Sequence, residues 1–244
     1  AGRSGKDYAL LIGTNEYIEH NNLSNPIFDL KRVQQDLNEL YKFNTEFVDN
    51  PTQNSLYLKL KEYSKREFAD DDQLLIFIAG HGEFDNTFKE GYIVCKDSKK
   101  NDEAKASLIS HSNLRTIINN IPCKHIFLVM DVCFGGTFDP SIAHRGGGDY
   151  EDADNQEFIN RKMRYKTRVY LTSGGKEYVP DGRPGYHSPF AHNFIEALSS
   201  SGGSDGILTV SEVMSYVEKT VPGPRIGSFG DNQPGSDFLF IIRK

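Results

Sequence analysis

The sequence has few cysteines, no long apolar run and no excess of basic residues, and each of these absences excludes a class of protein. Its three cysteines are an odd number without paired spacing, so neither a disulfide framework nor a zinc site is expected. No apolar run approaches the roughly 18 residues of a membrane-spanning helix, and residues 1–7 lack the apolar core of a signal peptide. We therefore expect a chain that works in the reducing cytoplasm, without a membrane or a metal ion.

The charge balance and the loop sequences exclude two kinds of binding protein. The chain has 34 acidic and 28 basic residues, a net charge of −6, so it lacks the basic surface of a nucleic-acid-binding protein. Residues 13–16 (Gly-Thr-Asn-Glu), which follow the first apolar stretch, are not a glycine-rich phosphate loop, which argues against a nucleotide-binding domain. The chain begins with Ala1 rather than Met, so we expect a trimmed protein that leaves room for additional domains outside it.

What is present is an alternation of apolar and amphipathic stretches over 244 residues, which fits one large α/β domain. Apolar runs predict strands at 8–13, 45–48, 74–79, 126–130, 168–173 and 237–242, with a hairpin or edge segment at 88–95. Apolar residues at helical spacing predict helices at 26–41, 55–68, 110–121, 188–198 and 209–221. This alternation favours an α/β fold with a mostly parallel central sheet and helices on both faces.

The stretch from His125 to Gly136 carries the first chemical signal. Residues 126–130 are all apolar, as in a central parallel strand buried on both faces, and Asp131, Cys133 and two glycines follow at once. In an open α/β sheet, ligands bind at the carboxyl ends of the strands. A thiol held there by a rigid strand is placed to attack a substrate.

A second apolar run, residues 74–79, ends in a histidine between two glycines, so we expect His81 and Cys133 to meet at one edge of the sheet. Taken alone, a cysteine after a strand is usually a small buried hydrophobe, and a histidine there is usually structural. The two together, each at the tip of an apolar strand and beside glycine, favour a Cys-His dyad. We expect the other two cysteines, Cys95 and Cys123, to be packing residues, and His111 and His125 to be structural. We assign no role to His187 and His192.

Three motifs together resemble the caspase and metacaspase superfamily of cysteine peptidases. They are residues 9–13 (Ala-Leu-Leu-Ile-Gly), the Gly-His-Gly turn around His81, and residues 131–136 (Asp-Val-Cys-Phe-Gly-Gly). His81 precedes Cys133 by 52 positions, close to the caspase spacing of about 50. Segments 188–190, 205–206 and 232–234 resemble prokaryotic members, so the resemblance covers nearly the whole chain from Tyr8. It implies a caspase-like three-layer α/β sandwich with cysteine endopeptidase activity.

Among these relatives, the chain is most similar to metacaspases, because Asp-Val-Cys stands where animal caspases have Gln-Ala-Cys. Metacaspases and paracaspases have an aspartate two residues before the nucleophile that binds a basic side chain at the cleavage position, and Asp131 occupies that place. A second pocket acid early in the first helix matches Asp29, although residues 26–29 depart from the usual local sequence. Alternatively, Asp29 favours its helix dipole and Asp131 caps a following helix. The resemblance implies polypeptide substrates cleaved after Arg or Lys.

The chemistry of such a site assigns further roles. A free thiol has a pKa of about 8.5, so we expect His81 to act as the base for Cys133 and later as the proton donor to the leaving amine. Backbone N–H groups of Gly82 and Cys133 would hold the oxyanion. The strand end at Ser173 and Gly174 could pair with the substrate backbone as an added strand, a role that the family also implies for this loop.

The clearest break in the pattern is residues 139–166, which show no apolar periodicity and which we expect to be a linker. It would divide a single domain, 1–244, into a large-subunit-like part at about 7–138 and a small-subunit-like part at 167–244. Family members are often cut in the corresponding region, so we expect self-cleavage after one of the basic residues there, most of which form a cluster at its end: Arg145, Arg161, Lys162, Arg164 and Lys166.

Three alternatives remain open. The chain could be a caspase-fold scaffold without activity, although such a scaffold need not keep His81, Cys133 and their glycines. It could also be a caspase-like peptidase with a different primary specificity. Calcium activates some metacaspases, but residues 70–72 (Asp-Asp-Asp) fit a solvated turn better than a calcium site, so no cofactor is expected from the sequence.

Overall fold

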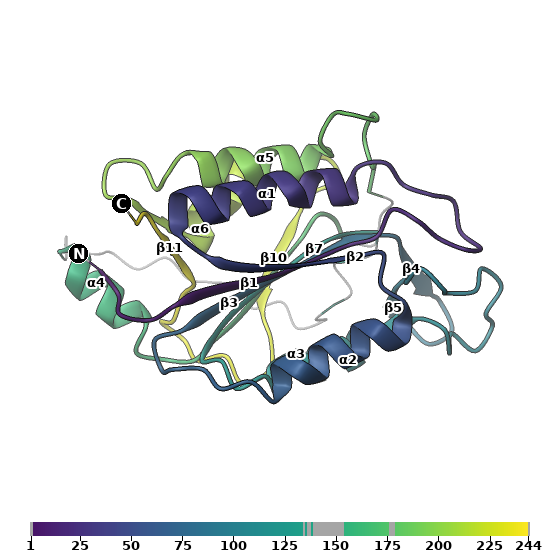
Figure 1. Ribbon diagram of the computed structural model, residues 1–244, viewed down its shortest axis with the longest axis horizontal. Coiled ribbons are helices and arrows are strands. Elements are labelled where there is room, and N and C mark those ends of the chain that lie inside the picture. The colour runs from purple at the N-terminus through teal and green to yellow at the C-terminus, as the bar shows by residue number, and fades with distance from the viewer. Residues whose placement is uncertain (1, 134, 136–137, 139–153, 176–178, 244) are drawn as a thin grey trace.

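The middle layer of the protein is a six-stranded sheet, seen nearly edge-on in Figure 1, the computed structural model. The structure describes residues 2–133, 135, 138, 154–175 and 179–243. Across the sheet the strands follow the order β10 (Arg225–Ser228), β8 (Thr167–Thr172), β7 (His125–Val132), β3 (Gln73–Gly80), β1 (Asp7–Gly13) and β2 (Asn44–Asp49). All neighbouring pairs are parallel except the edge pair β10 and β8. The predicted mostly parallel sheet is confirmed.

Helices cover both faces of this sheet (Figure 1). On one face lie α1 (Pro26–Tyr41), α5 (Pro189–Ser199) and α6 (Val210–Val217); on the other lie α2 (Gln53–Ser64) and α3 (His111–Asn119). The apolar stripe of α1 packs Leu30, Val33 and Leu37 into one core cluster, while residues of α2 and α3 join the cluster below the sheet. The central strands β3 and β7 are buried on both faces, so their sequences are continuous apolar runs. These runs allowed both strands to be predicted.

Smaller sheets flank the central one. Strands β4 (Gly82–Asp85), β5 (Glu90–Ile93) and β6 (Ile109–Ser110) form an antiparallel sheet, which confirms the expected hairpin. The predicted strand at 237–242 is shorter, β11 (Leu239–Ile241), and pairs with β9 (Ile207–Thr209) outside the main sheet. Strand β10 was missed, because its four residues include only one apolar side chain, Ile226.

Part of the segment 139–166, which we expect to be a linker, is helical. Residues 155–162 form the helix α4 (Asn155–Lys162), which the side chain of Asp154 caps by accepting the backbone N–H groups of Gln156 and Glu157. Ile159 and the following Met163 are buried in a small cluster with the β9–β11 pair. Only one side chain within the helix is buried, so no apolar periodicity marks it in the sequence.

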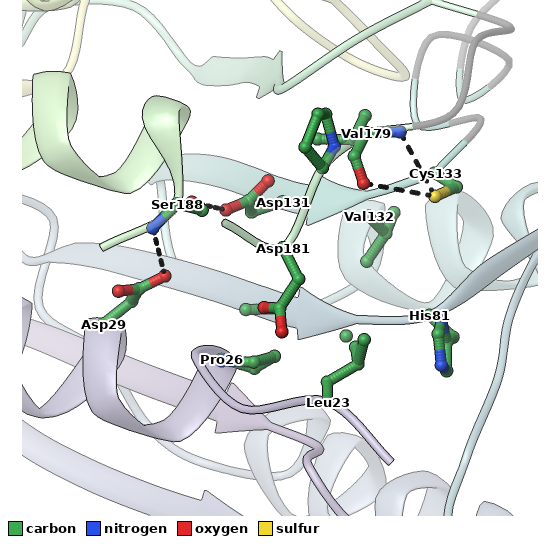
Figure 2. A pocket seen from close by; sticks show the side chains of 13 residues that line it. Leu23, Pro26, Asp29, His81, Asp131, Val132, Cys133, Val179, Asp181 and Ser188 are labelled. Atoms are coloured by element: carbon green, nitrogen blue, oxygen red, sulfur yellow. Dashed lines mark hydrogen bonds between the residues drawn. The ribbon is translucent and has the colours of Figure 1, made fainter. Parts of the chain in front are cut away.

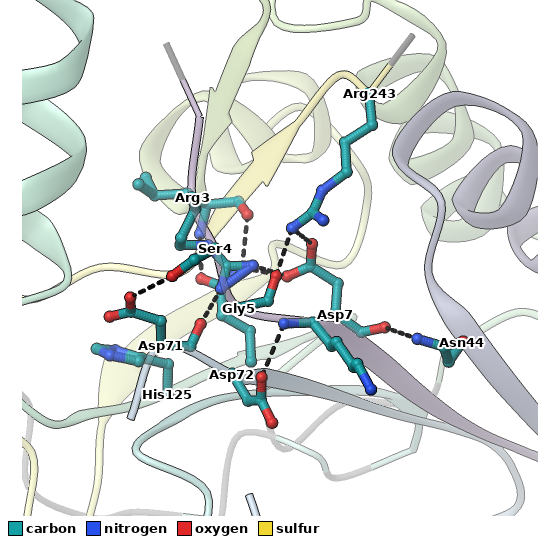
Figure 3. Close-up of polar contacts among 12 residues, drawn as sticks. Arg3, Ser4, Gly5, Asp7, Asn44, Asp71, Asp72, His125 and Arg243 are labelled. Atoms are coloured by element: carbon teal, nitrogen blue, oxygen red, sulfur yellow. Dashed lines mark hydrogen bonds and ion pairs between the residues drawn. The ribbon is translucent and has the colours of Figure 1, made fainter. Parts of the chain in front are cut away.

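Residues 70–72 also differ from the expected solvated turn, because Asp72 is buried and accepts the backbone N–H of Lys6 at 2.7 Å and of Ala69 at 2.9 Å. Close by, at the amino ends of the strands, lies an ion-pair network (Figure 3). The carboxylate of Asp7 accepts the guanidinium groups of Arg3 and Arg243, the latter at 2.8 Å. These contacts join the two ends of the described chain, at the edge of the sheet opposite the predicted site (Figure 1).

Replacing Asp7 with Asn is expected to lower the free energy of unfolding by about 3–5 kcal/mol, because the buried guanidinium of Arg3 loses its charged partner. Urea denaturation of the wild type and of Asp7→Asn measures the difference. Lys96→Ala serves as the matched control, since it breaks an exposed ion pair with Glu16 whose loss costs at most about 1 kcal/mol. Equal losses in the two variants would contradict the structural role of the network.

Candidate active site

His81 and Cys133 come to the same edge of the sheet because the strands that precede them are direct neighbours. Strands β3 and β7 are parallel, with Gly80 opposite Val132, so the next residue on each strand is the histidine and the cysteine. Both residues line one cavity, which also contains both predicted acids, Asp29 and Asp131. The structure therefore brings together four residues predicted from three separate stretches of sequence (Figure 2).

The thiol of Cys133 is buried, with 6% of the residue exposed. Its sulfur accepts the backbone N–H of Val179 at 3.4 Å and lies 3.8 Å from the carbonyl oxygen of the same residue. Burial raises the pKa of the thiol, and the nearby carboxylate of Asp131 raises it further. At Gly82, an added Cβ would overlap the carbonyl oxygen of Cys133, so only glycine fits this approach. The resting thiol is therefore protonated and needs a base.

The ring and the backbone of His81 are each held by a contact with the loop that follows β1. Its Nε2 lies 2.8 Å from the carbonyl oxygen of Asn21, which can only accept, so Nε2 carries the hydrogen and Nδ1 is left with a free lone pair. Its backbone N–H donates to the hydroxyl of Tyr17 at 2.9 Å, and the two rings lie 4.7 Å apart. Burial lowers the pKa of His81, which keeps the imidazole neutral at neutral pH.

The two acids are linked through one residue, Ser188, the N-cap of α5 (Figure 2). Its hydroxyl donates to Asp131 at 2.8 Å, and its backbone N–H donates to Asp29 at 3.3 Å. Burial raises the pKa of both carboxyl groups, that of Asp29 to about 8. A basic side chain would stabilise both carboxylates, because the charged form is the one that burial disfavours. Asp29 also lies in the first turn of α1, where the alternative role of favouring the helix dipole places it. The helix that Asp131 would cap after Cys133 falls largely outside the described residues.

Residues 179–181 cover the cavity, which has a volume of about 30 Å³. By that measure it holds about two water molecules and no arginine side chain. The covering segment is fastened by Asp181, whose carboxylate accepts the backbone N–H of Ser24 at 2.8 Å and of Asn25 at 3.3 Å. The backbone of Val179 occupies the space beside the thiol. Nothing in the local sequence signals this cover, since it depends on contacts between distant loops.

The remaining predicted site residues lie outside the cavity lining. Ser173 is fully buried and donates its backbone N–H to Met130 at 3.0 Å, while Gly174 accepts the hydroxyl of Thr172 at 3.0 Å. One backbone group of each residue is thus already engaged in this structure. Of the predicted cleavage residues, Arg145 lies outside the described residues. The others fall in or after α4: Arg161, Lys162, Arg164 and Lys166.

Other expectations concerned cysteines, metals and membranes. Cys95, Cys123, His111 and His125 are buried, in keeping with the packing or structural roles expected for them. Within the described ranges, no group of three or more His, Cys, Asp or Glu residues could hold a metal ion. No helix among those residues is long and apolar enough to cross a membrane.

Comparison with known proteins identifies the family. The family model for the caspase domain matches residues 6–235, which is nearly the whole chain. The chain belongs to the caspase family. Membership of this family makes the chain a cysteine-type endopeptidase. No curated protein matches the chain in sequence.

The caspase fold is also found by structural comparison. The chain is similar to caspase-1 from Spodoptera frugiperda, with a TM-score of 0.63 and 14% sequence identity over 93% of this chain and 88% of that one. At this identity the likeness shows the fold alone. The predicted three-layer caspase-like sandwich is therefore confirmed, while the roles of single residues depend on the geometry of the site.

Proposed function

We propose that this caspase-family protein is a metacaspase-like endopeptidase that uses Cys133 and His81 to cleave polypeptides after Arg or Lys. The observation that carries the proposal is the cavity itself, in which a cysteine and a histidine lie with two carboxylates from different elements. Asp29 comes from α1 and Asp131 from β7, so a basic side chain between them would meet acceptors on two sides. Two carboxylates would also repel an acidic side chain, which sets this pocket apart from one for aspartate.

The geometry supports a mechanism with His81 as base and acid. Its Nδ1 takes the proton of the Cys133 thiol, and the thiolate attacks the carbonyl carbon of the substrate. The oxyanion that forms is held by the backbone N–H groups of Gly82 and Cys133. His81 then gives the proton to the leaving amine as the C–N bond breaks. A water molecule, deprotonated by His81, hydrolyses the thioester and restores the thiol.

Asp131→Asn tests the proposed specificity. The variant keeps an acceptor for the Ser188 hydroxyl but removes the charge two residues before the nucleophile. We expect kcat/KM for a peptide with Arg at the cleavage position to fall by an amount equivalent to about 2–5 kcal/mol, or roughly 30- to 4,000-fold. Steady-state kinetics with matched peptides measures this change.

The thermal midpoint of Asp131→Asn provides the control. Burial raises the pKa of this carboxyl, so the ionised group opposes folding at neutral pH and its loss should leave stability equal or higher. A wild-type protein that prefers Asp over Arg at the cleavage position in a peptide library would contradict the proposed specificity.

Two further parts of the proposal concern the setting of the enzyme. The three cysteines are free, which fits the reducing cytoplasm as the place where it acts. We also include self-cleavage after a basic residue between Arg145 and Lys166, because the two carboxylates proposed to bind a basic side chain of the substrate would also attract the basic side chains of that segment.

A further inference from the structure

One contact in the pocket has no role in the mechanism above, the contact between Asp29 and His187. The Nδ1 atom of His187 lies 2.6 Å from Oδ1 of Asp29, a short hydrogen bond from an imidazole to a carboxylate. The imidazole ring also stacks on Phe28, with ring centres 4.7 Å apart, and its side chain is 21% exposed. His187 is therefore held against Asp29 and is still exposed enough to exchange protons with the solvent.

The surroundings of this pair favour proton exchange near neutral pH. Arg32 from α1 and His192 from α5 face His187 and oppose its positive charge. Asp131 and Asp181 face Asp29 and oppose its negative charge, in addition to the effect of burial. A neutral His187 that donates its Nδ1–H to the carboxylate leaves the pair with one negative charge. One bound proton makes the pair neutral overall, whichever of the two groups carries it.

We propose that His187 is a specificity-determining residue of the basic pocket, which shares one proton with Asp29 and so sets the pH range in which the pocket distinguishes a charged side chain from a neutral one. This inference rests on the proposed function. Above that range the pair attracts a basic side chain. Below it the pair is neutral, and a positively charged side chain must compete with the bound proton for the carboxylate.

The test compares two peptides that differ only at the cleavage position, where one has arginine and the other its neutral analogue citrulline. kcat/KM is measured for each from about pH 5.5 to 9, and the ratio of the two values is plotted against pH. Protonation of Cys133 or His81 affects both peptides equally and cancels in the ratio. In the wild type we expect the arginine preference to rise roughly tenfold with pH, because deprotonation restores one charge to the pocket.

His187→Asn keeps an N–H donor for Asp29 but cannot take up a proton, so the midpoint of the rise should move down by about one pH unit or more. Asp29→Asn should lower the arginine preference and flatten the curve, since the carboxylate of the pair is gone. His192→Asn serves as a comparison, because it removes only a group that opposes protonation of His187 and leaves the contact between His187 and Asp29 in place. The rise should remain in this variant. Cleavage of the citrulline peptide shows that each variant is folded.

The outcomes separate this inference from the proposed function. An arginine preference that does not change with pH in the wild type, or that has the same midpoint in His187→Asn, would overturn the role of His187 while leaving the cleavage specificity in place. Failure of the wild type to prefer arginine over citrulline at any pH would overturn the proposed specificity, and the role of His187 with it.

Discussion

A chain in which Cys133 is replaced by Ala is expected to lose peptide-bond cleavage, by at least about 10³-fold in kcat, and still to fold. The reason is chemical, because alanine removes the sulfur that attacks the substrate and nothing else in the cavity can replace it. The substitution is small, and the thiol contacts the backbone of Val179 rather than holding core elements together. Turnover of a peptide with Arg at the cleavage position, measured beside the thermal midpoint, separates the two effects.

His81→Ala should have nearly the same effect, because the pKa of the thiol is raised by burial and the thiolate does not form without a base. Cys95→Ala is the matched control, since this cysteine is buried in the core and away from the cavity. It should keep its turnover. Normal turnover in Cys133→Ala or in His81→Ala would show that the dyad is wrongly assigned.

Labelling with a thiol-reactive peptide distinguishes an enzyme from a silent scaffold of the same fold. An active site with a substrate pocket should direct the label to Cys133, and the label should require Arg or Lys at the cleavage position. The other two cysteines are buried, and burial raises the pKa of each thiol to about 12, so they react slowly. Absence of specific labelling in a protein that is otherwise folded would favour the scaffold.

The sequence predicted the centre of the fold because the central strands leave a strong pattern. Strands β3 and β7 are unbroken apolar runs, and the polar residues that follow them, His81 and Cys133, could be placed at one edge by the rule for parallel sheets. Helix α1 begins at Pro26 and ends at Tyr41, as its proline and its apolar stripe indicated. Because these elements are buried on one or both faces, their sequences contain apolar patterns from which they could be predicted.

The peripheral elements could not be predicted in the same way. Strand β10 and helix α4 each bury few of their side chains, so neither shows the periodic spacing of apolar residues from which a strand or helix is predicted. Asp72 was read as solvated, since a run of three acids usually is, but backbone N–H groups from distant and local residues surround it. Sequence gives no sign of such contacts.

Part of the candidate site could be predicted from the sequence, because it lies at the ends of strands that have a strong apolar pattern. His81 follows β3, Cys133 follows β7 and Asp131 lies near the end of β7. The resemblance to a known family marked Asp29. Val179 and His187 belong to the part of the chain between β8 and α5, where Asp181 contacts Ser24 and Asn25 and His187 contacts Asp29 of α1. A histidine before a serine N-cap carries no recognisable signal, so the interaction of His187 with Asp29 could be found only in three dimensions.

The freshly purified wild type is expected to become cut within residues 145–166, while Cys133→Ala stays intact. This segment connects β7, which ends beside the thiol, to β8, and it contains the basic side chains that the pocket should prefer. The structure changes the expected order of cutting, because Arg161 and Lys162 lie in α4 and a peptidase requires an extended substrate. Arg164 is exposed in the bend after the helix, and Lys166 pairs with Asp231 at 3.1 Å. Arg164 is therefore the best candidate among the described residues.

Intact-mass measurements of both proteins over time decide the matter. Fragments that end at Arg164 or at another basic residue of the segment, found in the wild type alone, would support self-cleavage. The two fragments should elute together, since β7 and β8 pair along six positions of the central sheet and the cut leaves those hydrogen bonds intact. Arg164→Gln provides the matched variant, because it removes one cleavage position without touching the pocket. Intact wild-type protein after prolonged incubation, under conditions in which it turns over a peptide substrate, would show that the segment is not cut.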